Sequence, residues 1–105
     1  MSNTDSFLTL DPQMTIVAWT SGVEKIFGYK ASEILGKPVF TLVPEDLVNS
    51  AQSVLREVMA EGRVHGFQTE RIAKGGQRIK IVADLLAIRN ASGDHCATQI
   101  TVRRL

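Results

Sequence analysis

The chain has 105 residues, the length of one domain, and we expect a single domain over residues 1–105 with its core over about 7–103. Its 44% hydrophobic and 22% charged residues exclude a disordered chain, and no apolar run approaches the roughly 20 residues that span a bilayer. The net charge of +1 provides no overall attraction to nucleic acid or to acidic membranes, so we expect neither as a partner.

The cellular location is suggested by the N-terminus and by the single cysteine. The first residues lack the basic and then apolar pattern of a signal peptide. Cys96 has no second cysteine to pair with, which fits a reducing compartment. We therefore expect a cytoplasmic protein in which Cys96 is a buried structural residue.

The first part of the chain predicts a hairpin and two short helices. Residues 7–10 and 14–19 have strand-like patterns, with the turn residue Pro12 between them. Apolar residues then recur at i, i+3 and i+4 up to Gly28, which can adopt the left-handed conformation that ends a helix. A second short helix is predicted over residues 32–35.

One long helix is predicted over residues 44–60, after an apolar connector at residues 39–43. Pro44 suits the first turn of a helix, and Gly62 is expected to cap its far end. The apolar residues of this helix form one stripe, made of Leu47, Ala51, Val54, Leu55, Val58 and Met59. We expect that stripe to lie across one face of a sheet.

Three strands are predicted to complete the chain, over residues 65–72, 78–88 and 96–103. Gly75 and Gly76 supply the positive φ angles of a tight turn between the first two. The three strands are therefore expected to form a meander.

The middle strand of this meander is apolar on both faces between residues 82 and 88, where Asp84 is the one polar side chain. A strand of this kind is covered on both faces. The helices of the domain provide one cover, and we expect the other to be a flanking helix or a second protomer. Asp84 has two interpretations, a base with a shifted pKa or, as is more common, a residue at the solvent edge that caps a backbone amide.

Basic residues gather late in the chain. Residues 1–70 carry nine acids and five bases, whereas residues 71–105 carry two acids and seven bases. We expect these bases on the solvated outer edge of the sheet, with an acidic partner as the alternative: Arg71, Lys74, Arg78, Lys80, Arg89, Arg103 and Arg104. No aromatic residues are interleaved with them, which argues against direct binding of nucleic acid.

The order of these elements and six segments in the same order resemble the PAS domain family. The matching segments are residues 19–20, 26–37, 42–46, Gly66, 71–76 and 87–93, and the resemblance covers the chain from about residue 7 to its end. It implies an α+β fold, with a five-stranded antiparallel sheet and the short helices and one long helix packed on one face.

Two positions depart from the family pattern. Gly75 replaces a turn Asp or Asn, which is chemically harmless. Arg104 stands where the family carries an acid that helps to set the exit toward an effector helix. We therefore expect either that the chain continues in a longer protein or that the signal leaves through the N-terminus.

The resemblance implies a sensory or regulatory module that signals by dimerisation, or by docking to an effector in cis or in trans. Such effectors include histidine kinases, cyclases and transcription regulators. We expect a homodimer, formed through the outer face of the sheet or through a flanking helix. The alternative is a sensor domain that binds haem, non-covalent flavin or a hydrophobic metabolite, although no cofactor is required. An enzyme is not expected, because the chain lacks phosphate loops and nucleophile motifs.

The pocket that the resemblance implies lies between the inner face of the sheet and the helices. Its candidate lining residues are Trp19, Phe27, Phe40, His65, Phe67 and Ile100. Light-sensing members carry a reactive cysteine where this chain has Val39, and a glutamine where it has Val102, so cysteine-adduct flavin chemistry is excluded.

Haem and metal sites have weaker candidates. Related sensors hold haem through a histidine where this chain has Arg63, and His65 becomes a ligand only in a shifted register. His65 and His95 are expected too far apart to share one metal ion, so we predict no metal site.

Overall fold

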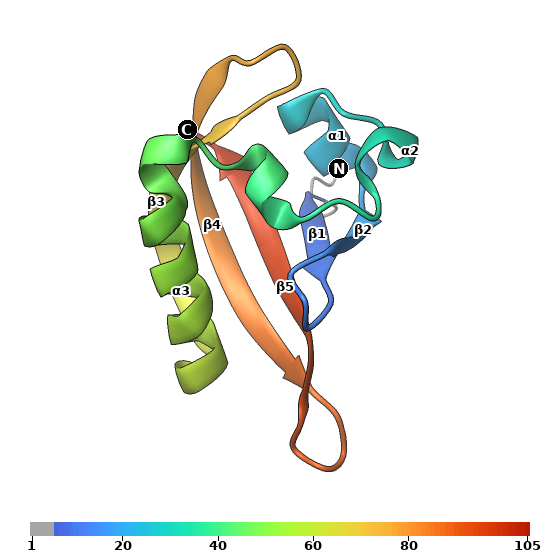
Figure 1. Ribbon diagram of the computed structural model, residues 1–105, viewed down its shortest axis with the longest axis vertical. Helices are drawn as coiled ribbons and strands as arrows, with labels where there is room; N and C mark the ends of the chain where they lie inside the picture. Colours follow the sequence, from blue (N-terminus) through green and yellow to red (C-terminus); the bar gives the residue numbers. More distant parts are fainter. Residues whose placement is uncertain (1–5) are drawn as a thin grey trace.

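A computed structural model describes residues 6–105, which form one five-stranded antiparallel sheet with the helices on one of its faces (Figure 1). The strands lie in the order β2-β1-β5-β4-β3. Their bounds are β1 Phe7–Leu10, β2 Ile16–Trp19, β3 Arg63–Ile72, β4 Arg78–Arg89 and β5 His95–Arg104. The helices are α1 Ser21–Phe27, α2 Ala31–Ile34 and α3 Val48–Glu61, with the 3-10 turns η1 Val39–Leu42 and η2 Glu45–Leu47. The predicted α+β fold is confirmed.

The long helix begins later than the sequence predicts. Residues Glu45–Leu47 form the separate 3-10 turn η2, and α3 starts only at Val48. The break lies at Leu47, whose ψ of 8° departs from helical geometry. The other end is as predicted, since Gly62 has a φ of 89° and donates its N–H to the Val58 carbonyl at 2.7 Å. None of the helices in the described chain is long and apolar enough to cross a bilayer.

The short helices are fastened to the tip of the β3–β4 hairpin. Gly28 ends α1 with a φ of 84°, and the adjacent Phe27 carbonyl accepts the N–H of Lys74 at 2.8 Å. A Cβ atom at Gly28 would lie in ordinary contact with the Cβ of Lys74, at 3.5 Å, so a larger residue would be strained by its positive φ rather than by lack of space. Segments some 46 residues apart in sequence (Gly28 and Lys74) thus meet at one point.

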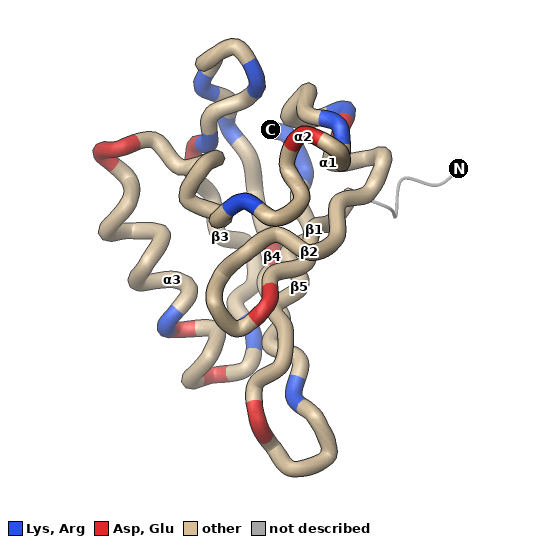
Figure 2. The backbone as a smooth tube through the Cα atoms, turned by 45° about the vertical axis from the view of Figure 1, so that its right-hand side comes forward, with Lys and Arg blue, Asp and Glu red and all other residues tan. Residues whose placement is uncertain are grey.

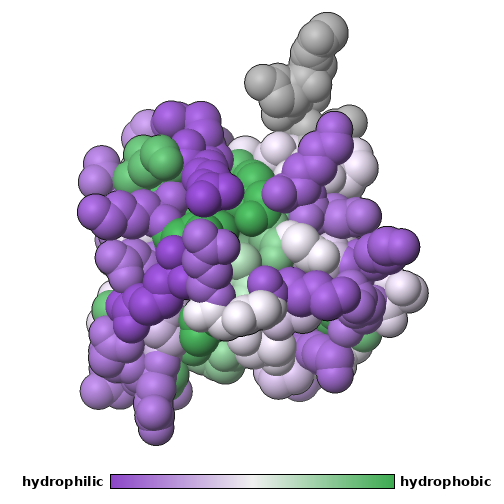
Figure 3. Space-filling view, turned by 90° about the horizontal axis from the view of Figure 1, so that it is seen from above, coloured by the Kyte–Doolittle hydropathy of each residue, from purple (hydrophilic) through white to green (hydrophobic). Residues whose placement is uncertain are grey.

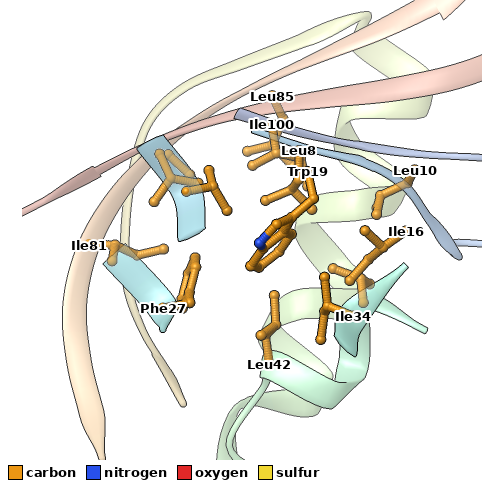
Figure 4. Close-up of a cluster of buried hydrophobic side chains, with 14 of the residues drawn as sticks. Leu8, Leu10, Ile16, Trp19, Phe27, Ile34, Leu42, Ile81, Leu85 and Ile100 are labelled. Carbon is orange, nitrogen blue, oxygen red and sulfur yellow. The ribbon is translucent and has the colours of Figure 1, made fainter. Parts of the chain in front are cut away.

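The sheet has a closed inner face and an open outer face, and β4 displays both. Ile79, Ile81, Ala83 and Leu85 are each less than 5% exposed and point toward the helices. Residues between them, from Lys80 to Leu86, face the other side and are exposed or half-buried. Figure 4 shows side chains of the strands meeting those of α1, α2 and η1 in a single apolar core.

Two aromatic residues connect the first hairpin to the helices. The ring centroids of Trp19 and Phe27 lie 5.8 Å apart, and the Trp19 indole N–H donates to the Tyr29 carbonyl at 2.9 Å. This bond satisfies the polar atom of a large buried side chain and fixes the loop between α1 and α2. Trp19 is therefore a structural anchor of the helical segment.

The expected burial of Cys96 is wrong. Its side chain is exposed, and its thiol lies 3.4 Å from the Ile88 carbonyl. Parity with the buried Thr98 and Ile100 would place Cys96 on the inner face. The reason for its exposure is a register shift, since Ile88 pairs with Ala97 and Arg89 with His95, so that Cys96 is skipped in the pairing of β4 and β5.

Candidate functional site

An apolar cavity of about 40 Å³ lies in the core, between the inner face of the sheet and the helices. A cavity needs about 10–15 Å³ to hold one water molecule, so this one has room for about three groups of that size. Fourteen of its fifteen lining residues are apolar. They are Leu8, Phe27, Val39, Leu42, Val43, Ala51, Val54, Leu55, Phe67, Ile81, Ala83, Leu85, Ile100 and Val102.

Three of the six candidate pocket residues line this cavity, namely Phe27, Phe67 and Ile100. Trp19 packs against Phe27 and is not part of the lining. Phe40 is half-buried against the core and does not line the cavity either. Both positions that the family resemblance associates with light chemistry, Val39 and Val102, belong to the lining. Neither can form a flavin–thiol adduct or donate a hydrogen bond.

His65, the remaining candidate, lies on the other side of the sheet. Its side chain is 82% exposed, and its Nδ1 lies 2.9 Å from Asp84 Oδ1. The cause is an irregularity in the β3–β4 pairing between Val64 and Phe67, which places His65 and Gly66 together at the surface. His65 is therefore not in a position to ligate haem in the cavity.

Of its two interpretations, the structure supports Asp84 as a residue at the solvent edge that caps a backbone amide. It is half exposed on the outer face, and its Oδ1 accepts the backbone N–H of Gly66 at 2.8 Å. This hydrogen bond gives the Gly66 N–H the acceptor that it lacks in the irregular pairing of β3 with β4. Asp84 thus stabilises the bulge in β3. No group of three or more potential metal ligands gathers among the described residues.

Arg71 is the one charged residue among the described residues that line the cavity, whereas the sequence led us to expect it on the outer edge of the sheet. The structure corrects that prediction. Arg71 pairs with the buried Ile79 and shares its face of the sheet with Phe67 and Thr69. Alternate residues of a strand share a face, so counting from Phe67 predicts that Arg71 faces the core. The sequence hides this, because the neighbouring Ile72 is apolar and is the more typical core residue.

The guanidinium of Arg71 is held by its own strand. Its Nη1 donates to the Thr69 hydroxyl at 3.1 Å and to the Glu70 carbonyl at 2.8 Å. Burial lowers the pKa of Arg71 to about 10, because an apolar environment disfavours the charged form. The group remains protonated at neutral pH, so the cavity wall carries a positive charge.

Two other basic residues, on either side of the turn of this hairpin, have carboxylate partners. Lys74 contacts Glu33 of α2, and Arg78 binds Asp46 of η2 through two nitrogen–oxygen contacts of 2.9 and 3.3 Å. Arg78 also binds Glu70, at 2.8 Å. Figure 2 shows the basic positions of this hairpin at one end of the molecule. These contacts join the helical segment to the hairpin at the edge of the core.

The outer face of the sheet, the surface away from the helices, mixes apolar and charged residues. Leu86 is 39% exposed there, and Val82 and Ile88 are half-buried on the same strand. At one end of this face lies a groove of about 310 Å³ whose lining includes Val82, Asp84 and Arg103. A different view, from above the molecule, shows apolar surface framed by hydrophilic side chains (Figure 3).

Comparisons with known proteins identify the family. The sequence profile of the PAS domain matches residues 4–103. The chain therefore belongs to the PAS domain family, whose members are typically sensory modules. A comparison with curated protein sequences gave no match.

Solved structures with this fold include PAS and LOV domains. The PAS domain of a protein from Colwellia psychrerythraea has a TM-score of 0.85 at 26% identity, over 97% of this chain and 86% of that one. The light-state LOV domain of the blue-light photoreceptor Aureochrome1 gives 0.82 at 17% identity, over 98% and 83%. A fungal LOV domain photoreceptor gives 0.78 at 24% identity, over 100% and 76%. The last two similarities concern the fold alone.

Proposed function

We propose that this PAS domain is a regulatory module that relays a signal by pairing with a second copy of itself through the outer face of its sheet. The observation that carries this proposal is a partly exposed apolar row on β4, formed by Leu86 and the half-buried Val82 and Ile88. An effector such as a histidine kinase, cyclase or transcription regulator, in cis or in trans, would receive the change in pairing. The free, exposed Cys96 suits a reducing cytoplasm as the place of action.

The charges on the outer face favour a copy of the chain as its partner. Asp84 and Arg103 lie on the neighbouring strands β4 and β5 and line the same groove. A face that carries both signs is able to pair with itself about a two-fold axis, so that each acid meets the base of the other protomer. A strongly acidic or basic partner would meet repulsion at one of the two positions.

The size of the face predicts a weak dimer. Five strands of four to twelve residues present about 600 Å² per protomer, at about 3.3 Å per residue and about 4.8 Å between strands. Two such faces bury about 1,200 Å², the low end for specific interfaces. Such a dimer would dissociate on dilution, and dissociation is a step that a signal could control.

The test is sedimentation velocity across a dilution series, with wild type and Leu86→Asp. We expect the wild type to change from dimer to monomer and the variant to remain monomeric, because a carboxylate on the apolar row opposes burial. Leu35→Asp is the matched control, since Leu35 is 44% exposed on the helical side. A monomeric wild type at every concentration, or a dimer that only Leu35→Asp disrupts, would refute the proposal.

A second function, ligand sensing, is favoured by the cavity and by Arg71 on its wall. At about 40 Å³ the cavity is far smaller than the roughly 300–1,000 Å³ of pockets for drug-sized ligands. A flavin or a haem does not fit it in this conformation, whereas a small metabolite does. The test is a search for small molecules that shift the inner-face resonances of Ile81 and Ala83.

A further inference from the structure

We propose that the cavity binds a small aliphatic monocarboxylate whose carboxylate is held by Arg71 and whose short apolar chain fills the core. The inference rests on the ligand-sensing role proposed above and names the class of ligand. It follows from three features of the cavity wall: its charge, the free edge of the guanidinium and the volume.

The charge on the wall lacks a protein counterion. Among the described residues, ion pairs within 4 Å involve His65, Lys74 and Arg78, and Arg71 takes part in none of them. Buried or half-buried charges in proteins are normally paired. Because Arg71 stays protonated, an anion that enters the cavity would supply the missing partner.

The hydrogen bonds of Arg71 leave one side of its guanidinium available. Both of its hydrogen-bond partners, the Thr69 hydroxyl and the Glu70 carbonyl, are bound by Nη1. Nε and Nη2 make no hydrogen bond with any described residue, and together they form the two-pronged edge that suits a carboxylate. The same two bonds orient the group, so little side-chain freedom would be lost on binding.

The rest of the lining selects against a second charge or an extensive polar group. The other fourteen lining residues are apolar, so a dicarboxylate or a sugar would bury polar atoms without partners. Inorganic phosphate has no apolar part to gain from these walls, and one arginine does not neutralise its two charges. The lining therefore fits one carboxylate attached to hydrocarbon.

The volume sets the length of that hydrocarbon. If the carboxylate lies on the half-buried Arg71 at the edge of the cavity, the room for about three water-sized groups takes about three carbon atoms beyond it. Butyrate and its close homologues fit this space, whereas acetate leaves it partly empty and decanoate exceeds it. Affinity is thus expected to rise from acetate to butyrate and to fall again for long chains.

The experiment titrates the protein with sodium butyrate, and separately with butyramide, a neutral compound of nearly the same shape. Methyl resonances of Ile81 and Ala83, two lining residues, report binding in the core. We expect butyrate to shift these methyls and to bind at least about tenfold more tightly than butyramide, because charge-assisted hydrogen bonds are the stronger ones. Inorganic phosphate should leave both methyls unchanged.

Two variants test the role of Arg71. Arg71→Gln should weaken butyrate at least about tenfold without affecting butyramide, and Arg71→Lys should fall between Gln and wild type. The matched control is Arg63→Gln, the same change at an exposed position of the same strand. A well-dispersed amide spectrum of each variant verifies its fold, and the lysine variant keeps the test valid where glutamine disturbs the strand.

A third variant tests the cavity itself. Ala83→Leu extends a lining residue into the space and should abolish the binding of butyrate and butyramide alike. Equal binding of butyrate to wild type and Arg71→Gln, or equal binding of butyrate and butyramide to wild type, would overturn the carboxylate assignment and leave the ligand site intact. If neither compound shifts the two inner methyls, both the ligand-sensing role and this inference fail.

Discussion

The two faces of the same sheet differ in what they can do. Along β4, the inward residues from Ile79 to Leu85 are buried among other apolar side chains, and the outward residues from Lys80 to Leu86 are exposed or half-buried. The inner face is closed around a small cavity, and among the described residues its lining carries one cation, Arg71. The outer face is open, mixed in charge and unpaired among the described residues. Two-residue periodicity thus allows one strand to serve a ligand site and an association surface together.

The largest effect that separates the two faces is expected for Phe27→Ala. Phe27 is 2% exposed and lies in the lining of the cavity, so its removal enlarges a hole that the core cannot close. We expect a loss of about 3–5 kcal/mol in the free energy of unfolding, measured by urea denaturation. The outer-face control, Leu86→Ala, should cost less than about 1 kcal/mol, since Leu86 is 39% exposed. Similar losses at both positions would mean that the outer face is as closed as the inner one.

A smaller effect is expected on the outer face for Asp84→Ala. The substitution removes the acceptor for the Gly66 N–H in the irregular part of β3. We expect a loss of about 0.5–1 kcal/mol in the free energy of unfolding, since the bond is half exposed to solvent. Asp84→Asn keeps an acceptor oxygen and should recover most of this loss. Faster hydrogen exchange at Gly66 in the alanine variant alone would locate the effect, and unchanged exchange would contradict it.

The smallest effect is the acid dependence of the contacts at the edge of the core. Lys74 lowers the pKa of Glu33, and Arg78 lowers the pKa of Asp46, in each case chiefly through a hydrogen bond to the carboxylate. A carboxyl whose pKa is lowered by folding stabilises the fold above its ordinary value, and the contribution is lost as pH falls through the lowered value. The free energy of unfolding should therefore decline below about pH 4.

The control for this prediction is Asp46→Asn, in which one of the two carboxyls no longer titrates. Denaturation curves between about pH 2 and pH 6 should show a shallower decline for this variant than for wild type. Both groups are exposed at the surface, so the difference should also shrink in high salt. An identical decline in the two proteins would assign the acid sensitivity to other carboxyls.

Much of the fold could be predicted because the decisive signals are local. Gly28 and Gly62 end their helices with φ angles of 84° and 89°, and Gly75 and Gly76 form the predicted turn with φ angles of 96° and 90°. Glycine provides these conformations without steric cost, so its position alone indicates where an element stops. The apolar stripe of α3 was equally visible, because its period is set by the helix itself.

The site was harder to predict because it depends on pairing between distant strands. The irregularity near Gly66 shifts the parity of β3 between Val64 and Phe67, which sends His65 to the surface, whereas Arg71 keeps the parity of Phe67 and lines the cavity. A one-residue shift exchanges the two faces of a strand, and no local pattern reveals it. The volume of the cavity also arises from side chains of seven helices, turns and strands and of the connecting residue Val43, so neither its size nor its single charge is apparent from any one of them.

The most direct test of the division between the two faces is one set of methyl spectra of β4, recorded with butyrate at high and low protein concentration. Ile81 and Ala83 face inward, and Val82 and Leu86 face outward. We predict that butyrate shifts the inward methyls at both concentrations, and that dilution shifts the outward methyls with or without butyrate. The account would be contradicted if dilution left Val82 and Leu86 unchanged, or if butyrate shifted only these two outward residues.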